Sequence, residues 1–352
     1  MECTRFESIG VYLPEKVVTT QELIDQMKHK PPFDLEELTG IRERRWRGND
    51  EDSHSLAVSA ARKCLHNSQY EANDIDVIIF CSITRFNKSF YQMEPALSKS
   101  LKNNLGMRPS AINFDISNAC AGMMSGVYML DGMIRAGTVR NGMVVSGECI
   151  TPITETAVKE SREPVDPQFA SLTVGDSGAA CIIDKALDDT ENIKAFEMLC
   201  LSNYADLCIG MPSEQNPGVA MYTDSLGIHN AVKCHLPAIL KNYMRNNGLS
   251  LAKDFDFVIP HQTSVRAIQS VADGCFAIMQ DETTITDIDS VPETLISVDK
   301  YGNTSSTSHF IVLHEYLKEG RIKKGSRILF LVMASGIILG ALSVTIGKME
   351  VN

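Results

Sequence analysis

Three residues with side chains suited to nucleophilic chemistry stand next to regular elements in the pattern of the chain: Cys120, His261 and Asn303. Cys120 and His261 each come shortly after an apolar run and before a stretch with helical periodicity, and Asn303 lies in a glycine-containing loop that opens a helix. A thiol, an imidazole and a carboxamide that converge can attack a carbonyl, transfer a proton and stabilise a developing oxyanion.

The segment INFDISNACAGMMSG predicts that Cys120 sits in an elbow between a strand and a helix. A thiol at a helix N-terminus is near backbone N–H groups and the positive end of the helix dipole, and both favour a thiolate. The alternative is that Cys120 is an ordinary buried cysteine and that His261 and Asn303 are cap or turn residues. The three together favour a catalytic site.

The overall composition excludes some classes of protein function. The 352 residues include 44% hydrophobic and 22% charged residues, which is typical of globular proteins, and the net charge is -11 with a pI near 5.3. This acidity argues against a nucleic-acid binder. The ten cysteines form no CxxC pair, so we expect no metal site and no disulfide scaffold. The N-terminal residues lack the apolar core of a signal peptide, and a cytoplasmic location is expected.

Short apolar runs separated by helix-period stretches predict an α/β fold with a mostly parallel sheet. The expected strands are residues 77–81, 111–116, 143–146, 179–183, 257–259 and 328–332, and the expected helices are 55–65, 94–105, 122–136, 231–246 and 308–319. The same order of elements occurs before and after about residue 185, which suggests two related halves, 1–185 and 186–352.

Two segments are ambiguous. Residues 328–347 are as long and apolar as a membrane-spanning helix, but Ser335, Gly336 and Gly340 interrupt them, so two buried strands joined by a glycine turn are the better interpretation. Residues 151–169 are rich in Pro, Glu and Thr, and we expect a surface loop or flap there.

At the three candidate positions the sequence resembles the β-ketoacyl-acyl-carrier-protein synthase III family of thiolase-like condensing enzymes. The matching segments are NACAGM around Cys120, IPHQTSVR around His261 and YGNTSSTS around Asn303, with further matches at TGIRERR (39–45), VGDSGAA (174–180) and GRIKKGSRILFLVMASG near the C-terminus.

The resemblance implies a thiolase-like five-layer αβαβα fold built from two related halves, and a homodimer. It implies that Cys120 takes an acyl group from a coenzyme A or acyl-carrier-protein thioester, and that an enolate then attacks the acyl-cysteine. His261 and Asn303 would stabilise the enolate oxygen, and the backbone N–H groups of Cys120 and of the Ser335–Gly336 turn would form the oxyanion hole. No cofactor is implied, because the thioesters are substrates.

Several positions depart from the family pattern. Asp34 and Leu38 stand where the family has a tryptophan and an arginine for coenzyme A, and Trp46, the only tryptophan, is by default a packed aromatic. Arg266 matches a family position near the pantetheine entrance. Ser335 replaces a glycine of the closing motif, but a backbone donor is kept.

Glu94, in a Glu-Pro pair, is the most informative departure. It resembles the glutamate of the head-to-head condensing enzymes of bacterial olefin synthesis and, less closely, ketosynthases that form dialkylresorcinols; in the olefin enzymes this glutamate reaches into the partner's active site as a base. An acyl thioester without a carboxyl group must lose an α-proton to become an enolate, which requires a positioned base. The alternative is a first-turn acid that complements a helix N-terminus. Glu148, after a strand, also resembles the head-to-head group.

We therefore expect an acyltransferase of specialised lipid or polyketide metabolism that condenses two acyl thioesters. The alternatives are the housekeeping decarboxylative synthase III, a non-catalytic thiolase-fold subunit and a cysteine hydrolase. An acidic carrier protein needs a basic patch, for which Arg266 and a run of arginines are candidates: Arg42, Arg44, Arg45 and Arg47. The alternative for the run of arginines is that its members are solvated or paired with acidic residues of the same chain. Four methionines after Cys120 would line an acyl tunnel or belong to the core: Met123, Met124, Met129 and Met133.

Overall fold

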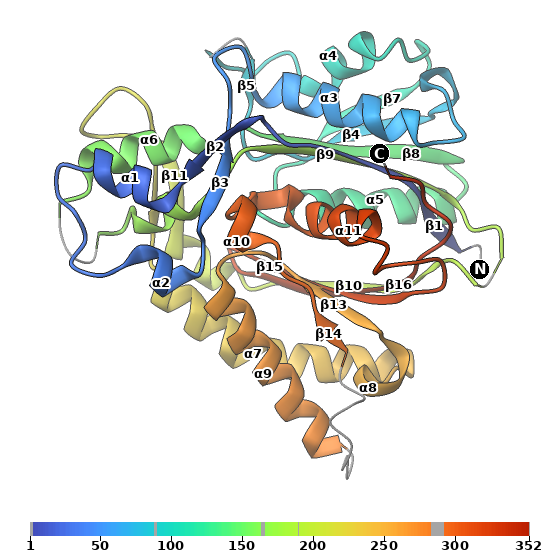
Figure 1. The fold of residues 1–352 in the computed structure, drawn as a ribbon. Helices are drawn as coiled ribbons and strands as arrows, with labels where there is room; N and C mark the ends of the chain where they lie inside the picture. Colours follow the sequence, from blue (N-terminus) through green and yellow to red (C-terminus); the bar gives the residue numbers. More distant parts are fainter. Residues whose placement is uncertain (1–2, 88–89, 163–165, 189, 283–291, 352) are drawn as a thin grey trace.

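The computed structural model describes residues 3–87, 90–162, 166–188, 190–282 and 292–351. Two five-stranded sheets lie one above the other (Figure 1). The first has the order β1 (Thr4–Tyr12), β9 (Ser177–Lys185), β8 (Asn141–Glu148), β4 (Val77–Phe80) and β7 (Ile112–Asp115). The second has the order β10 (Ile193–Cys200), β16 (Ile338–Thr345), β15 (Arg327–Ala334), β13 (Phe257–Pro260) and β14 (Glu293–Thr294).

The two sheets repeat the same pattern of strand directions. In each, the first two pairs are antiparallel and the last two are parallel. The predicted mostly parallel sheet is therefore wrong; β16, for example, returns after a three-residue turn, and so short a connection can only join antiparallel strands. The first sheet is complete at Lys185 and the second begins at Ile193. The assignment of 1–185 and 186–352 as domains stays a prediction.

Helices cover both sheets and fill the space between them, which gives five layers (Figure 1). Helices α3 (Ser53–His66) and α4 (Leu97–Asn104) lie on the outer face of the first sheet, and α5 (Gly122–Arg135) and α11 (Ser308–Lys318) lie between the sheets. Helices α7 (Ser225–Asn247), α8 (Leu251–Asp254) and α9 (Val265–Glu282) cover the second sheet. The largest apolar core is the central one, where α5 and α11 meet both sheets.

The remaining elements gather largely at one side of the sheets (Figure 1). They are β2 (Lys16–Thr19), α1 (Thr20–Gln26), α2 (Leu35–Thr39), β3 (Glu43–Trp46), α6 (Thr151–Glu160), β11 (Cys208–Pro212), β12 (Val219–Thr223) and α10 (Val298–Tyr301), with a small hairpin of β5 (Phe86–Asn87) and β6 (Phe90–Tyr91) beside α3.

The predicted loop at 151–169 is wrong over most of its length, because residues 151–160 form α6. Pro152 stands in the first turn, where a proline fits a helix, and Ile153, Thr154 and Ala157 are buried. The carboxylate of Asp176 accepts hydrogen bonds from the first backbone N–H groups of this helix. Tertiary burial thus stabilises a helix that the polar composition hides. Residues 163–165 lie outside the described part.

The apolar segment 328–347 is confirmed as two strands, β15 and β16, joined by a turn at residues 335–337. Both strands are almost entirely buried. None of the described helices combines the length and the apolar content that crossing a bilayer requires.

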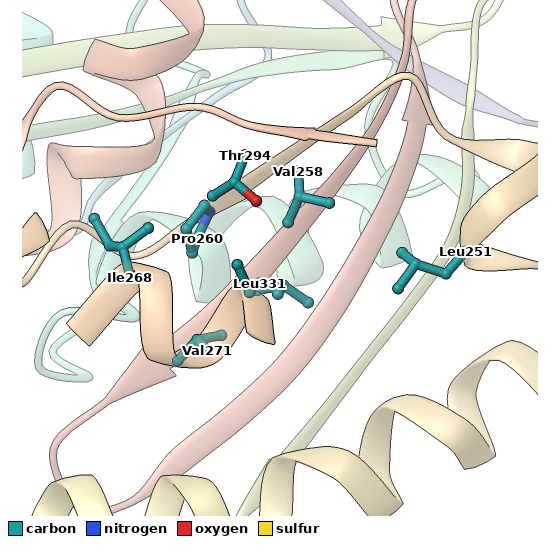
Figure 2. A pocket seen from close by; sticks show the side chains of 8 residues that line it. Leu251, Val258, Pro260, Ile268, Val271, Thr294 and Leu331 are labelled. Carbon is teal, nitrogen blue, oxygen red and sulfur yellow. The ribbon is translucent and has the colours of Figure 1, made fainter. Parts of the chain in front are cut away.

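Figure 2 shows a small cavity between the second sheet and the neighbouring helices. Its volume is about 10 Å³, which is room for one water molecule at most. The side chains around it are almost all apolar: Leu251, Val258, Pro260, Ile268, Val271, Ala272, Thr294 and Leu331. A space this small is a packing defect of the core and cannot hold an acyl chain.

Candidate active site

Cys120 lies in the elbow between β7 and α5 that its sequence predicts. The preceding Ala119 has a positive φ of 46°, which turns the chain sharply before the helix begins at Gly122. A Cβ atom at Gly122 would come within 2.2 Å of the backbone oxygen of Cys81, so only glycine lets the helix start this close to β4. The elbow thus places the sulfur where the strands of the first sheet end.

The surroundings of the sulfur oppose ionisation. Burial raises the pKa of the Cys120 thiol to about 12; the Ser305 hydroxyl, 3.7 Å from the sulfur, lowers it, while the nearby side chains of Cys208 and Glu148 raise it further. The expected resting thiolate is therefore not supported, because desolvation outweighs the N–H groups at the helix end. Cys120 is therefore a thiol at rest, and it would have to lose its proton in order to act as a nucleophile.

His261 follows β13 and is buried, as its strand-end position predicts. Its backbone N–H donates to Leu331 O, and its Nδ1 atom lies 2.7 Å from the Ser308 hydroxyl oxygen. Burial, followed by the neighbouring His309 ring at 5.8 Å, lowers the pKa of His261 to about 3. The imidazole is therefore neutral at physiological pH. If the Ser308 hydroxyl donates to Nδ1, the single ring proton stands on Nε2.

Gln262 fixes the loop that carries His261. Its side-chain Nε2 donates to Pro260 O and Leu295 O, and its Oε1 accepts from the N–H groups of Ser297 and Val298. All of these partners are backbone atoms, so the position of the loop is tied to two neighbouring segments. The sequence analysis did not single out Gln262.

Asn303 lies in the loop after α10, and its backbone N–H donates to Thr173 O. Its side-chain oxygen accepts from the N–H of Ser305 at 2.9 Å. This bond directs the oxygen of the carboxamide into its own loop and turns the NH₂ group away from it. The orientation suits a side chain that donates to a substrate oxygen.

The segment 303–308 links the three candidate residues. Asn303 begins it, Ser305 contacts the sulfur of Cys120, and Ser308 contacts the ring of His261. The structure thus brings the three predicted residues to one region from three distant parts of the sequence. Ser305 and Ser308 were missed by the sequence analysis; the run of hydroxyl residues after Asn303 was the available signal.

Glu94 is exposed and does not lie in a helix, since α4 begins only at Leu97. The N–H groups of Leu97 and Ser98 donate instead to the carboxylate of Asp115, each at 3.0 Å. The alternative of Glu94 as a first-turn acid is therefore wrong, because Asp115 has that role. Within the described residues, Glu94 forms no hydrogen bond or ion pair, so none of these residues gives its carboxylate a structural task.

The turn at Ser335 and Gly336 connects β15 to β16, and Gly336 has a φ of 118° that favours glycine. The next residue, Ile337, exchanges two backbone hydrogen bonds with Leu201, at 2.7 and 3.1 Å. These bonds fix the turn. The oxyanion hole formed by this turn and the N–H of Cys120 stays a prediction.

The predicted arginine run does not form one basic patch. Arg44 is fully buried, where its side chain donates to Thr20 Oγ1 and Leu172 O, so it cannot dock a partner. Arg47 pairs with Glu155, and the guanidinium of Arg45 lies over the ring of Tyr301.

Arg42 and Arg266 are the exposed members of the candidate set, each with 59% of its side chain accessible. Arg42 pairs with Asp299 at 2.8 Å, while Arg266 is 4.0 Å from Glu37. The backbone near Arg42 approaches α9 closely, since a Cβ atom at Gly40 would touch the side chain of Val265. The two guanidinium groups therefore belong to neighbouring segments of one region.

The methionines after Cys120 divide between two environments. Met123 and Met124 are fully buried in the central core, with Met133 packed against it, whereas Met129 is exposed on α5. The core interpretation therefore holds for the first two, and Met129 cannot line a tunnel inside its own subunit.

Comparisons with known proteins agree with this arrangement. The family model for 3-oxoacyl-[acyl-carrier-protein] synthase III matches residues 114–201, and the model for the C-terminal part of that family matches residues 244–346. The β-ketoacyl-[acyl-carrier-protein] synthase III of Alkalilimnicola ehrlichii is 27% identical over 350 residues, which cover 97% of this chain and 98% of that protein. The β-ketoacyl-[acyl-carrier-protein] synthase III 1 of Bacillus cereus is 26% identical over 346 residues, with equal coverage.

Solved structures show the same fold. The 3-oxoacyl-[acyl-carrier-protein] synthase III of Aquifex aeolicus has a TM-score of 0.79 at 24% identity, covering 97% of this chain and 99% of that one. A structure of Xanthomonas campestris OleA with bound lauric acid and lauroyl-CoA has a TM-score of 0.82 at 21% identity, covering 98% and 99%.

The fold and the matched segments define a condensing enzyme of the thiolase-like class. Within this class the chain belongs to the 3-oxoacyl-[acyl-carrier-protein] synthase III family, and it is an acyltransferase.

Proposed function

We propose that this enzyme condenses an acyl group carried on Cys120 with a second acyl thioester, and that Glu94 of the partner subunit removes the α-proton of that second substrate. The observation that supports the covalent route is the contact of one segment, 303–308, with both Cys120 and His261. The carboxylate of Glu94, which has no polar partner among the residues that the structure describes, supports the proton-abstracting route.

In the first stage, the sulfur of Cys120 attacks the thioester carbonyl and loses its proton, which ends on the sulfur of the departing thiol. Because burial keeps the thiol protonated, proton loss accompanies attack rather than preceding it. The carbonyl oxygen takes negative charge, and the backbone N–H groups of Cys120 and of the Ser335–Gly336 turn donate to it. The products are an acyl-cysteine and a free thiol.

In the second stage, Glu94 of the partner subunit takes the α-proton of the second thioester. The enolate oxygen accepts from Nε2–H of His261 and from the NH₂ group of Asn303. The enolate carbon attacks the acyl-cysteine, a carbon-carbon bond forms, and the thiolate of Cys120 leaves and is reprotonated. A neutral imidazole with its proton on Nε2 suits this donation, and the low pKa of His261 provides it.

A homodimer is part of this proposal, because Glu94 belongs to an apolar and exposed hairpin region. Phe90 and Met93 are 77% and 80% exposed, and Ile112, on the edge strand β7, is 42% exposed. Edge strands with exposed apolar side chains favour association with another chain. Pairing at β7 would cover this surface and carry Glu94 toward a second active site.

The acyl donors are proposed to be thioesters of an acidic carrier protein or of coenzyme A, without a further cofactor. Because the enzyme itself carries a charge of -11, a carrier protein requires a local positive region, and Arg42 and Arg266 supply one. The reaction would serve specialised lipid or polyketide synthesis in the reducing cytoplasm.

A second candidate is the decarboxylative condensation of an acyl starter with a malonyl carrier protein, as in housekeeping fatty-acid initiation. The names of the curated relatives favour it. In that reaction the loss of carbon dioxide generates the enolate, and no base is needed.

The two routes are separated by product analysis with acyl and malonyl thioesters, each on coenzyme A and on carrier protein. We expect condensation of two acyl thioesters without release of carbon dioxide. Glu94→Gln should retain acylation of Cys120, measured by intact mass, and lose condensation, whereas Cys120→Ala should lose both. An absolute requirement for the malonyl group would establish the decarboxylative route instead.

A further inference from the structure

Glu148 is a buried carboxylate at the end of β8 with an unusual set of partners. One oxygen accepts from Ser82 Oγ at 2.8 Å and from Thr84, and the other accepts from Ser306 Oγ at 2.5 Å. Longer bonds come from the backbone N–H groups of Ile83, Thr84 and Ser306, at 3.3 to 3.4 Å. Within the described residues no Lys, Arg or His pairs with it, so neutral donors alone offset the cost of its burial.

The partners of Glu148 come from both halves of the chain. Ser82, Ile83 and Thr84 follow β4 of the first sheet, whereas Ser306 belongs to the segment 303–308 that contains Asn303. Ser306 is fully buried, and its hydroxyl also lies 2.8 Å from that of Ser146 on β8. The carboxylate therefore holds the Asn303 segment against the strand ends of the other half.

The held segment contains a strained residue. Ser305 has a φ of 53°, in the left-handed region that a residue with a side chain rarely adopts, and it is the residue that contacts the sulfur of Cys120. Such a conformation persists only where surrounding contacts determine it. Asn303 accepts from the N–H of Ser305, and Glu148 accepts from both the N–H and the hydroxyl of Ser306, the next residue.

We propose that Glu148 is a positioning residue for the condensation step, which acts by holding Ser306 and thereby the Asn303 carboxamide in the orientation that receives the enolate oxygen. The inference rests on the proposed function only in assigning Asn303 to the second stage.

A glutamine cannot replace this carboxylate. Each oxygen of Glu148 accepts at least one backbone N–H, which cannot rotate away, so the NH₂ group of a glutamine would face a donor in either orientation. Glu160 on α6 is a matched control. It is also buried, but its donors among the described residues are all side chains, those of Ser213, Asn216 and Gln168, which can rearrange around an amide.

The test measures the two stages separately in Glu148→Gln and Glu160→Gln. For Glu148→Gln we expect Cys120 acylation within about threefold of wild type and condensation reduced about 100-fold, as expected for a displaced catalytic group. Glu160→Gln should change neither stage. In an Asn303→Ala background, Glu148→Gln should cause little further loss, because it acts through Asn303.

Two results would overturn the inference in favour of a general structural role. One is that Glu148→Gln lowers the rates of acylation and condensation equally. The other is that Glu148→Gln lowers the condensation rate as much in the Asn303→Ala background as it does in the wild type. If Glu148→Gln does not fold, Ser306→Ala serves as the second variant, because it removes one donor and leaves the carboxylate in place. We expect the same selective loss of condensation in Ser306→Ala, but a smaller one. An unchanged condensation rate in this variant would overturn the inference. If wild type itself shows no condensation, the proposed function fails first. If the wild type condenses normally and the variants are unaffected, only the role of Glu148 is refuted, and the proposed function is not.

Discussion

The sulfur of Cys120 is buried, which keeps the thiol protonated and has a measurable consequence. Because burial raises the thiol pKa to about 12, we expect the rate of alkylation of Cys120 by iodoacetamide to rise continuously from pH 7 to pH 10. Peptide mass spectrometry separates this site from the exposed Cys200 and Cys234, which act as internal references. If the alkylation rate stops rising before pH 8 is reached, the helix end stabilises a thiolate after all.

The neutral state of His261 can be tested through stability. Its pKa is about 3 in the folded protein and near 6.5 in an unfolded chain, so between these values the unfolded state binds more protons. The stability of the folded state therefore falls as the pH is lowered through this window. Relative to His261→Asn, which does not titrate, the free energy of unfolding of the wild type should fall by about 2 kcal/mol from pH 7 to pH 5. Urea unfolding of both proteins at the two pH values measures this difference, and a constant difference would contradict the assignment.

At the same scale, residue types alone predicted the Cys120 elbow and the strand-end position of His261, because local patterns determine both. They did not predict the ionisation state of the thiol or the burial of Arg44, since these depend on neighbours from distant segments. Ser305 and Ser308 were hidden for the same reason: the run of hydroxyl residues after Asn303 marks the segment but does not indicate which serine contacts a sulfur or an imidazole.

Among the elements, α3 owes its position to glycines on three adjacent strands. A Cβ atom at Gly10, Gly147 or Gly178 would come within 1.9 to 2.3 Å of the backbone of this helix. The helix itself contributes small residues to the contact, including Ala57, Ala60 and Ala61, all fully buried. Helix and sheet therefore meet almost backbone to backbone.

This close contact predicts opposite effects of the same substitution at two sites. Gly178→Ala should lower the free energy of unfolding by about 1–3 kcal/mol or more. The Cβ atom of the alanine would lie 2.3 Å from Leu56 O, so α3 must shift. Gly132→Ala, on α5 with open space around it, should instead stabilise the protein by about 0.5–1 kcal/mol. Thermal unfolding measures both, and equal effects at the two positions would rule out the tight packing of α3.

The elements that the sequence predicted well are those with strong local signals, such as the apolar strands β4 and β15 and the helix α5. The errors have physical causes outside the local pattern. Helix α6 is polar in composition but is capped by Asp176, the residue before β9, and buried by its neighbours, and α4 begins at Leu97 because Asp115 of β7 caps it there. The direction of β1 against β9, with Thr4 opposite Lys185, joins residues too distant for any sequence window.

For the molecule as a whole, the exposed surfaces lie where the proposed dimer needs them. Strand β7 is an edge of its sheet and leads directly into Cys120, and Ile112 on it is exposed. The hairpin of β5 and β6 carries the exposed Phe90 and Tyr91 shortly before Glu94. An interface along β7 would thus connect Cys120 of one subunit with the exposed carboxylate of Glu94 of the other.

Complementation between inactive subunits tests this arrangement. Cys120→Ala lacks the nucleophile and Glu94→Gln lacks the base, so neither homodimer should condense two acyl thioesters. In a mixed dimer, the subunit with an intact Cys120 receives an intact Glu94 from its partner, which restores one of two sites.

After denaturation and refolding of an equal mixture, half of the dimers are mixed, and we expect roughly a quarter of the wild-type condensation rate. Each variant refolded alone is the control. If Glu94 acted within its own subunit, every site in the mixture would lack either the thiol or the base, and the activity would stay at the level of the separate variants. Recovery therefore requires that the two groups meet across the interface.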